Sequence, residues 1–146
     1  MITLQTDPFD PGALLSVFSA NRTDAGAVVS FTGVARADDG PQTTLELEAY
    51  PGFTERQIEA IAAEATARFN LLDLLVIHRT GPIKVAEAIV FVAAAARHRR
   101  EAFEGADFMM DYLKSRAPFW KKETGDQGSR WIEPTARDRT DAERWD

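Results

Sequence analysis

Hydrophobic and polar positions along this chain follow two periods, which predicts a mixture of strands and helices. Five segments have the alternating or continuous apolar pattern of β-strands, namely residues 2–5, 26–33, 43–50, 71–78 and 88–96. Gly81 and Pro82 separate the last two of these segments. This pair is a turn signal, so we predict a hairpin-like connection between two buried strands.

Three other segments carry apolar residues at helical spacing. The first begins after Asp10, a helix-capping residue that is followed by proline. The second begins at Thr54, which forms the sequence pattern of a capping box with Gln57. The third begins near Arg99 and ends before Pro118, because proline cannot continue a helix.

In the C-terminal region, the residue pattern predicts two short strands, residues 119–122 and 130–133, around a turn at 125–128. Residues 134–146 are polar, and we expect a mobile tail in which Trp145 is the one large apolar side chain able to dock. Helices interspersed with strands in hairpin order indicate the α+β class. We therefore predict one domain over residues 1–133, with a mixed or antiparallel sheet and three main helices.

Composition limits the function classes that fit this chain. Of 146 residues, 45% are hydrophobic and 27% charged, which is too apolar for a disordered protein. The formal net charge of −6 argues against a general binder of nucleic acids or membrane surfaces, which usually has a basic excess. The chain has no cysteine and two histidines, so we predict no disulfide, no cysteine nucleophile, no metal site and no cofactor.

Targeting signals are not evident in the sequence. The longest apolar run, residues 88–96, is far shorter than a membrane span. The first residues lack the basic and apolar regions of a signal peptide. We therefore expect a cytoplasmic protein, in keeping with the absence of cysteine.

Basic residues gather at the predicted start of the third helix, where residues 97–100 read Arg-His-Arg-Arg. The helix dipole makes each cation at this end unfavourable by roughly 0.3–1 kcal/mol. An anionic ligand would offset this cost, because helix N-termini and arginine side chains bind phosphate together. In the alternative interpretation, these side chains extend into water or pair with Glu101 and Glu104.

Two lysines and one arginine outside this cluster are candidates for chemistry. Lys114 lies in the last turn of the third helix, where the dipole alone would favour a cation. Lys121 follows Phe119 on the same face of a predicted strand, and a lysine partly buried beside another cation can act as acid or base. Arg36 lies in a turn, where a solvated arginine is the commoner case, and His78 is most simply a buried core histidine.

Five segments together resemble a known family, the large catalytic subunit of molybdopterin synthase. They are FTGVAR from residue 31, LELEAYPGFTE from 45, IHRTGPI from 77, EAIVFVAAAARHRREAF from 87 and DYLKSRAPFWKKE from 111. The resemblance spans about residues 2–133 in unbroken order. Ala86 departs from it, since the family often has glycine before the acidic residue at this turn, which leaves the shape of the turn open.

The resemblance implies an α/β hammerhead-type fold and a sulfurtransferase activity. The family converts cyclic pyranopterin monophosphate to molybdopterin. Sulfur comes from the C-terminal thiocarboxylate of a small ubiquitin-like subunit. Two large subunits form a central homodimer within a heterotetramer, and no nucleic acid or membrane takes part.

The resemblance also implies the site residues. Lys114 and Lys121 correspond to the two catalytic lysines, and Phe31 and Met110 to supporting wall residues. Arg130 corresponds to an arginine that reaches the site of the neighbouring large subunit. Ten residues would bind substrate, namely Val34, Ala35, Arg36, His98, Arg99, Lys114, Lys121, Lys122, Glu123 and Arg130.

Two other functions remain open from the residues alone. A non-enzymatic module could use the basic cluster to bind an acidic or extended partner tail. An RNA-binding domain could use residues 97–100 with Phe119 and Trp120 for base stacking, although the net charge of −6 counts against it.

Overall fold

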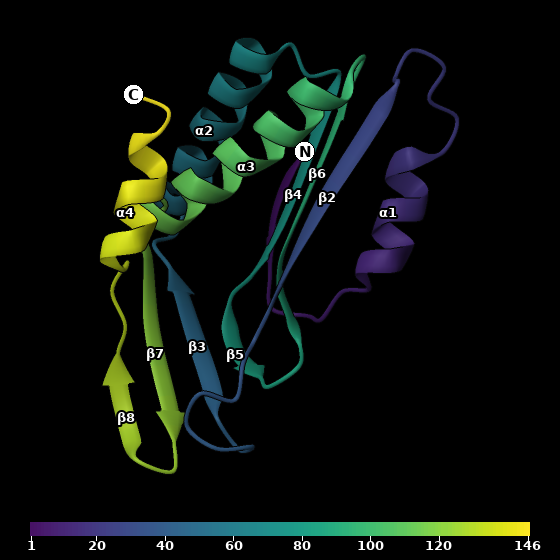
Figure 1. Cartoon of the computed structure of the whole chain (residues 1–146). Helices are drawn as coiled ribbons and strands as arrows, with labels where there is room; N and C mark the ends of the chain where they lie inside the picture. The colour runs from purple at the N-terminus through teal and green to yellow at the C-terminus, as the bar shows by residue number, and fades with distance from the viewer.

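The structure, a computed structural model of residues 1–146, contains two four-stranded sheets and four helices (Figure 1). The first sheet has the spatial order β1 (Ile2–Gln5), β4 (Asp73–Arg79), β6 (Ala88–Ala96), β2 (Ala27–Val34). In this sheet β1 and β4 are parallel, and the other neighbours are antiparallel. The second sheet is antiparallel throughout, in the order β5 (Gly81–Lys84), β3 (Thr44–Ala49), β7 (Phe119–Gly125), β8 (Gly128–Trp131). The predicted α+β class is confirmed.

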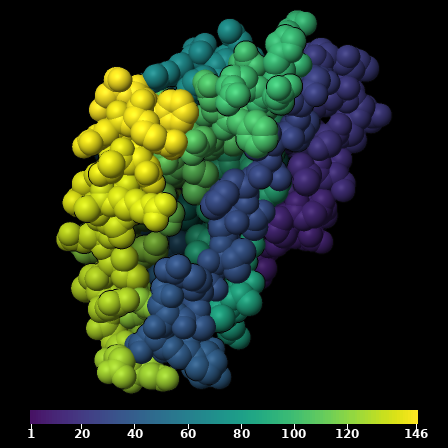
Figure 2. Space-filling model, viewed as in Figure 1, coloured from purple at the N-terminus to yellow at the C-terminus, as the bar shows by residue number.

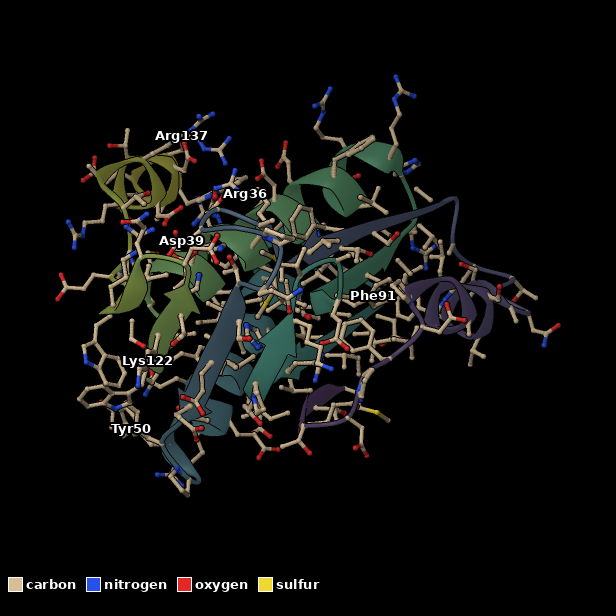
Figure 3. All side chains as sticks on the ribbon, turned by 90° about the horizontal axis from the view of Figure 1, so that it is seen from below. Arg36, Asp39, Tyr50, Phe91, Lys122 and Arg137 are labelled. Carbon is tan, nitrogen blue, oxygen red and sulfur yellow. The ribbon has the colours of Figure 1, made fainter.

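Helices cover both faces of the first sheet. α2 (Phe53–Phe69) and α3 (Arg99–Ser115) lie on one face, and α1 (Pro11–Ser19) lies on the other (Figure 1). Along β6, Val90 and Val92 therefore contact the α2–α3 side, while Phe91 contacts the α1 side (Figure 3). Burial on both faces explains why this strand reads as one continuous apolar run.

The predicted start of the second helix is close to the observed one, but the predicted capping box is wrong. The N-cap residue is Gly52, and no side chain caps this helix. Thr54 is buried instead, and its Oγ1 accepts a hydrogen bond from the Tyr50 N–H at 2.9 Å and donates one to the Pro118 carbonyl at 2.6 Å. Thr54 thus ties α2 to the turn between α3 and β7.

Two elements were not predicted. Residues between the buried strands form β5 in the second sheet, rather than a simple hairpin turn.

Residues of the expected tail form a fourth helix, α4 (Ala136–Glu143), so the predicted number of helices is wrong. After α4, Trp145 packs against the rings of Phe69 and Phe108, and its Nε1 donates a hydrogen bond to Asp111 at 2.6 Å. So short a polar helix has no clear periodicity, and its docking on α3 supports it. A domain boundary after residue 133 stays a prediction.

The turn at Ala86 adopts a glycine-like conformation despite the alanine. Its φ of 74° lies in the left-handed region, which costs an alanine about 1–2 kcal/mol. The Ala86 N–H donates to the Ala35 carbonyl at 2.9 Å, and the Ala35 N–H donates to the Glu87 carbonyl at 3.0 Å. The turn thereby fixes the start of the loop that carries Arg36.

None of the four helices has the length and apolar character that a membrane crossing requires.

Candidate functional site

Lys114 and Lys121 meet where the end of α3 passes the start of β7. Lys114 is in the last turn of α3, and the chain turns at Pro118 into β7. Strand alternation places Lys121 on the same face of β7 as Phe119 and Glu123. The two lysine side chains are within hydrogen-bonding reach of each other. The sequence indicated this face of Lys121, and the fold brings Lys114 to it.

Burial and charge alter the acidity of this pair. Burial, followed by the positive charge of Lys114, lowers the pKa of Lys121 from 10.5 to about 8. The carboxylates of Asp138 on α4 and Glu123 on β7 act in the opposite direction. An amine with this pKa is present in both protonation states near neutral pH, so it can both donate and accept a proton.

We expect Lys121 to titrate near pH 8 in the folded chain. About half of its amine should then be neutral at pH 8, against about 0.3% for an ordinary lysine. Because folding lowers this pKa, the unfolded chain binds more protons between pH 8 and 10.5, and the free energy of unfolding should rise with pH across that window. Carbon and proton NMR shifts at lysine Cε against pH measure the midpoint, with Lys121→Arg identifying the signal. A midpoint near 10.5 would contradict the burial argument.

A buried histidine lies beside the lysine pair. His78 is 8% exposed, and its ring stacks on Phe119 with centroids 4.2 Å apart and planes 19° apart. Its pKa is lowered to about 4, mainly by burial and also by the charges of Lys114 and Lys121. The interpretation of His78 as a buried core histidine agrees with the structure. Its nearness to the lysines had no signal in the sequence.

Glu123 and Arg130 form an ion pair across the β7–β8 hairpin. Glu123 is 5% exposed, and its Oε2 accepts hydrogen bonds from Arg130 Nη2 at 2.8 Å and Nε at 3.1 Å. A carboxylate this buried requires such a partner, and the pairing raises the pKa of Arg130. In an isolated chain, Arg130 therefore engages its own Glu123.

Arg36 lies on the loop that joins β2 to β3. Its side chain is 82% exposed, and its Nε is 3.1 Å from Asp38 Oδ1, a pair that stabilises little at this exposure. Asp38 and Asp39 line an open polar pocket of about 240 Å³ with Arg130 and residues 127–129 (Figure 3 labels Arg36 and Asp39). Figure 2 shows the surface hollowed between the blue loop after β2 and the yellow-green C-terminal residues.

The basic cluster, residues 97–100, lies at the other end of α3. With Gly26 and Glu101 it lines an open pocket of about 410 Å³. A Cβ at Gly26 would lie 2.1 Å from the Arg97 carbonyl oxygen, so this close approach requires glycine. None of these basic residues forms an ion pair in the chain, so the alternative of pairing with Glu101 and Glu104 is not observed. The cluster has cationic side chains available for an anion.

Helix length separates this cluster from the lysine pair. Lys114 follows Arg99 by fifteen positions on one helix, which is about 22 Å along its axis. A single chain therefore presents two groups of predicted site residues, with His98 and Arg99 at one end of α3 and Lys114 and Lys121 at the other.

The remaining predicted site residues lie on other surfaces. Phe31 and Val34 on the edge strand β2 are 44% and 51% exposed, Ala35 is buried, and Met110 on α3 is half-buried at the margin of the core.

Lys122 lies on the opposite face of β7 from Lys121. Its ammonium is 5.8 Å from the centre of the Trp131 ring, and Trp120 and Tyr50 lie on the same side (Figure 3). The expectation that the Lys122 side chain shares the Lys121 pocket is therefore not met within one chain, because successive residues of a strand face opposite sides.

Similarity to known proteins covers nearly the whole chain. The family model described as MoaE protein matches residues 4–116. A molybdopterin synthase catalytic subunit of Caulobacter vibrioides is 62% identical over 146 residues, which span 100% of this chain and 97% of the relative. The solved MoaE protein of Burkholderia ambifaria MC40-6 is 42% identical with a TM-score of 0.84, covering 99% of this chain and 97% of that one. The molybdopterin synthase structure from Staphylococcus aureus is 29% identical with a TM-score of 0.78, covering 88% and 94%.

Proposed function

The chain belongs to the MoaE protein family, and on that premise we propose that it is the catalytic subunit of a molybdopterin synthase. It is a sulfurtransferase of molybdenum cofactor biosynthesis, which converts cyclic pyranopterin monophosphate to molybdopterin. The observation that carries the chemistry is the pair of Lys114 and Lys121, in which burial and mutual repulsion lower the pKa of Lys121 to about 8.

Lys114 and Lys121 have different roles in two successive sulfur transfers. The thiocarboxylate sulfur of the partner attacks an electrophilic carbon of the pterin side chain. A carbon–sulfur bond forms, a carbon–oxygen bond at the same carbon breaks, and the oxygen leaves after it takes up a proton. Water then breaks the bond between that sulfur and the acyl carbon of the partner, which leaves as a carboxylate. Lys121 donates and accepts the protons of these steps, and Lys114 stabilises the negative charge that develops.

The sulfur donor is a small ubiquitin-like subunit with a C-terminal thiocarboxylate. A chain without cysteine cannot carry the sulfur itself, so a partner must supply it. Its extended tail reaches the lysine pair, and the assembly is a heterotetramer around a homodimer of this chain. Relatives named as catalytic subunits favour this enzyme over a module that only binds a tail. We place the reaction in the cytoplasm.

A second copy of the chain completes the substrate pocket. His98 and Arg99 are too far from Lys114 in one chain to hold the same small molecule, at about 22 Å along α3. In a two-fold dimer, the basic end of one α3 can lie against the lysine end of the other, and each protomer then contributes to both pockets. Between these ends, Phe31 on β2 and Phe103 on α3 are 44% and 57% exposed, which suits a buried dimer face.

Reconstitution tests the proposed function. The purified chain, a thiocarboxylated small subunit and cyclic pyranopterin monophosphate should together yield a dithiolene product, detected after conversion to a fluorescent pterin. A small subunit ending in an ordinary carboxylate is the matched control and should give no product. If the same small subunit supports a related synthase but not this chain, the enzymatic proposal fails and tail binding alone remains.

A further inference from the structure

We propose that the ion pair of Arg79 and Glu87 fixes the loop that carries Arg36, so that Glu87 is a positioning residue for substrate binding. The contacts among these residues belong to the free chain. Their value for catalysis rests on the proposed function, in which Arg36 contacts the phosphorylated pterin.

A buried arginine anchors this ion pair. The Arg79 side chain is 4% exposed, and its Nη2 donates hydrogen bonds to the carbonyls of Thr6 at 2.9 Å and Pro82 at 3.3 Å. Its Nη1 has no hydrogen-bond partner but lies 3.3 Å from Glu87 Oε1. A guanidinium this deeply buried requires a carboxylate beside it, so the packing of Arg79 fixes the position of Glu87.

Glu87 closes the turn between β5 and β6. Its Oε1 accepts a hydrogen bond from the Lys84 N–H at 2.7 Å, and its own N–H donates to the Lys84 carbonyl at 3.1 Å. The Lys84 N–H, followed by Arg79, lowers the pKa of Glu87, so the carboxylate is charged at neutral pH. The exposed Lys84 side chain forms no ion pair, and Lys84 contributes its backbone to the turn.

The turn contacts Ala35 through both of its backbone groups. The Ala86 N–H donates to the Ala35 carbonyl at 2.9 Å, and the Ala35 N–H donates to the Glu87 carbonyl at 3.0 Å. Just before this residue, the register of β2 against β6 shifts between Gly33 and Val34. Such an irregularity changes the direction of a strand, and the turn then fixes where the chain continues.

Arg36 is the next residue of the chain. Its backbone follows a residue that is fixed at its N–H and its carbonyl, while its side chain is 82% exposed and available to a ligand. Farther along the loop, Asp39 accepts hydrogen bonds from the backbone N–H groups of Asp126 at 3.0 Å and Gln127 at 2.9 Å. Arg36 therefore lies between two anchors, and the turn is the nearer one. A looser turn would let Arg36 occupy more positions, which raises the entropic cost of binding an anion.

Amide hydrogen exchange of the free chain tests the contact. Glu87→Gln keeps an oxygen that can accept from the Lys84 N–H but removes the charge beside Arg79. The Ala35 N–H should then exchange about 10-fold faster, because a buried charge has lost its partner and the turn opens more often.

A distant amide of the same pair of strands is the control. The Gly26 N–H donates to the Ala96 carbonyl at 3.0 Å, at the opposite end of β2 and β6 from Ala35. Its exchange should stay as in the unaltered chain. Equal acceleration at both amides would show a loss of global stability in place of a loosened turn, and it would overturn the proposal, as would unchanged exchange at Ala35.

Ala86→Gly is a second variant with the opposite expected effect. Glycine relieves the left-handed φ of 74°, so the turn should open less often and the Ala35 N–H should exchange about 3–10-fold more slowly. This variant keeps the ion pair and tests the turn even if Glu87→Gln does not fold. Exchange at Ala35 that does not slow would contradict the role of the turn.

Steady-state kinetics separates positioning from folding. In Glu87→Gln, KM for the pterin should rise about 10-fold while kcat stays within about two-fold, whereas a partly unfolded preparation would lose kcat and keep its KM. Arg36→Ala should also raise KM. Adding Glu87→Gln to Arg36→Ala should cause no further rise, because effects that act through one group are not additive. A further 10-fold rise in the double variant would overturn the proposal.

The two kinds of measurement fail separately. Hydrogen exchange uses neither the partner nor the pterin, so a failed reconstitution would count against the proposed function and leave the contact of the turn with Ala35 standing. An active enzyme whose KM is unchanged in Glu87→Gln would do the reverse, and it would remove Glu87 from substrate binding.

Discussion

Lys121→Ala is expected to lower the rate of molybdopterin formation by about 10²–10⁴-fold, the range associated with losing a general acid–base group. Lys114→Ala should cause a loss of similar size, because it removes the cation proposed to stabilise the negative charge that develops. Single-turnover assays with the thiocarboxylated partner measure the rate. Calorimetric titration of the partner should show binding within a few-fold of the unaltered chain in both variants.

Lys84→Ala is the matched control for these variants. It removes the same ammonium from the exposed end of β5, at a position outside the predicted site residues. Its rate should stay within about three-fold of the unaltered chain, since an exposed charge contributes little. Near-normal rates in both Lys114→Ala and Lys121→Ala would remove the proposed chemistry. An equal loss in Lys84→Ala would show that the rate depends on lysines in general and not on the positions of Lys114 and Lys121.

The strands with strong hydrophobic patterns were predictable because the residues of each strand reflect its burial directly. β1 and β6 begin and end where the apolar pattern does. Both faces of β6 are buried, so no polar residue interrupts its apolar pattern. β5 and α4 were missed because each owes its existence to a neighbour. β5 pairs with β3, and α4 docks through Trp145 on the rings of Phe69 and Phe108.

The sequence named candidate site residues but indicated little of how they lie together, and their roles stay predictions. Strand alternation correctly placed Lys121 on the same face as Phe119, because it depends on local backbone geometry alone. Thr54 shows the limit of such local rules. Its sequence pattern favours a capping box, yet the turn before β7 supplies a carbonyl that its hydroxyl bonds instead. The approach of His78 to the lysines joins strands of two different sheets, and no local pattern encodes that contact.

Mixed dimers provide the sharpest test of a pocket shared between protomers. Arg99→Ala alone should reduce kcat/KM by about 10–100-fold, through loss of a charge-assisted phosphate contact, and Lys121→Ala alone should be nearly inactive. A dimer with one protomer of each kind has one pocket carrying both changes and one carrying neither. Isolated through two different affinity tags, it should recover about half the activity of the unaltered dimer, although both parents are impaired.

The reciprocal dimer makes the result unambiguous. When both substitutions lie in one protomer and the other is unaltered, a shared pocket leaves each site with one defect, and activity should stay at the level of the Arg99→Ala site or below. A pocket built within one chain gives the opposite pattern, because the unaltered protomer would keep a complete site and about half the activity. Half activity in this reciprocal dimer, with none recovered in the first, would place His98 and Arg99 outside the pocket of the lysine pair.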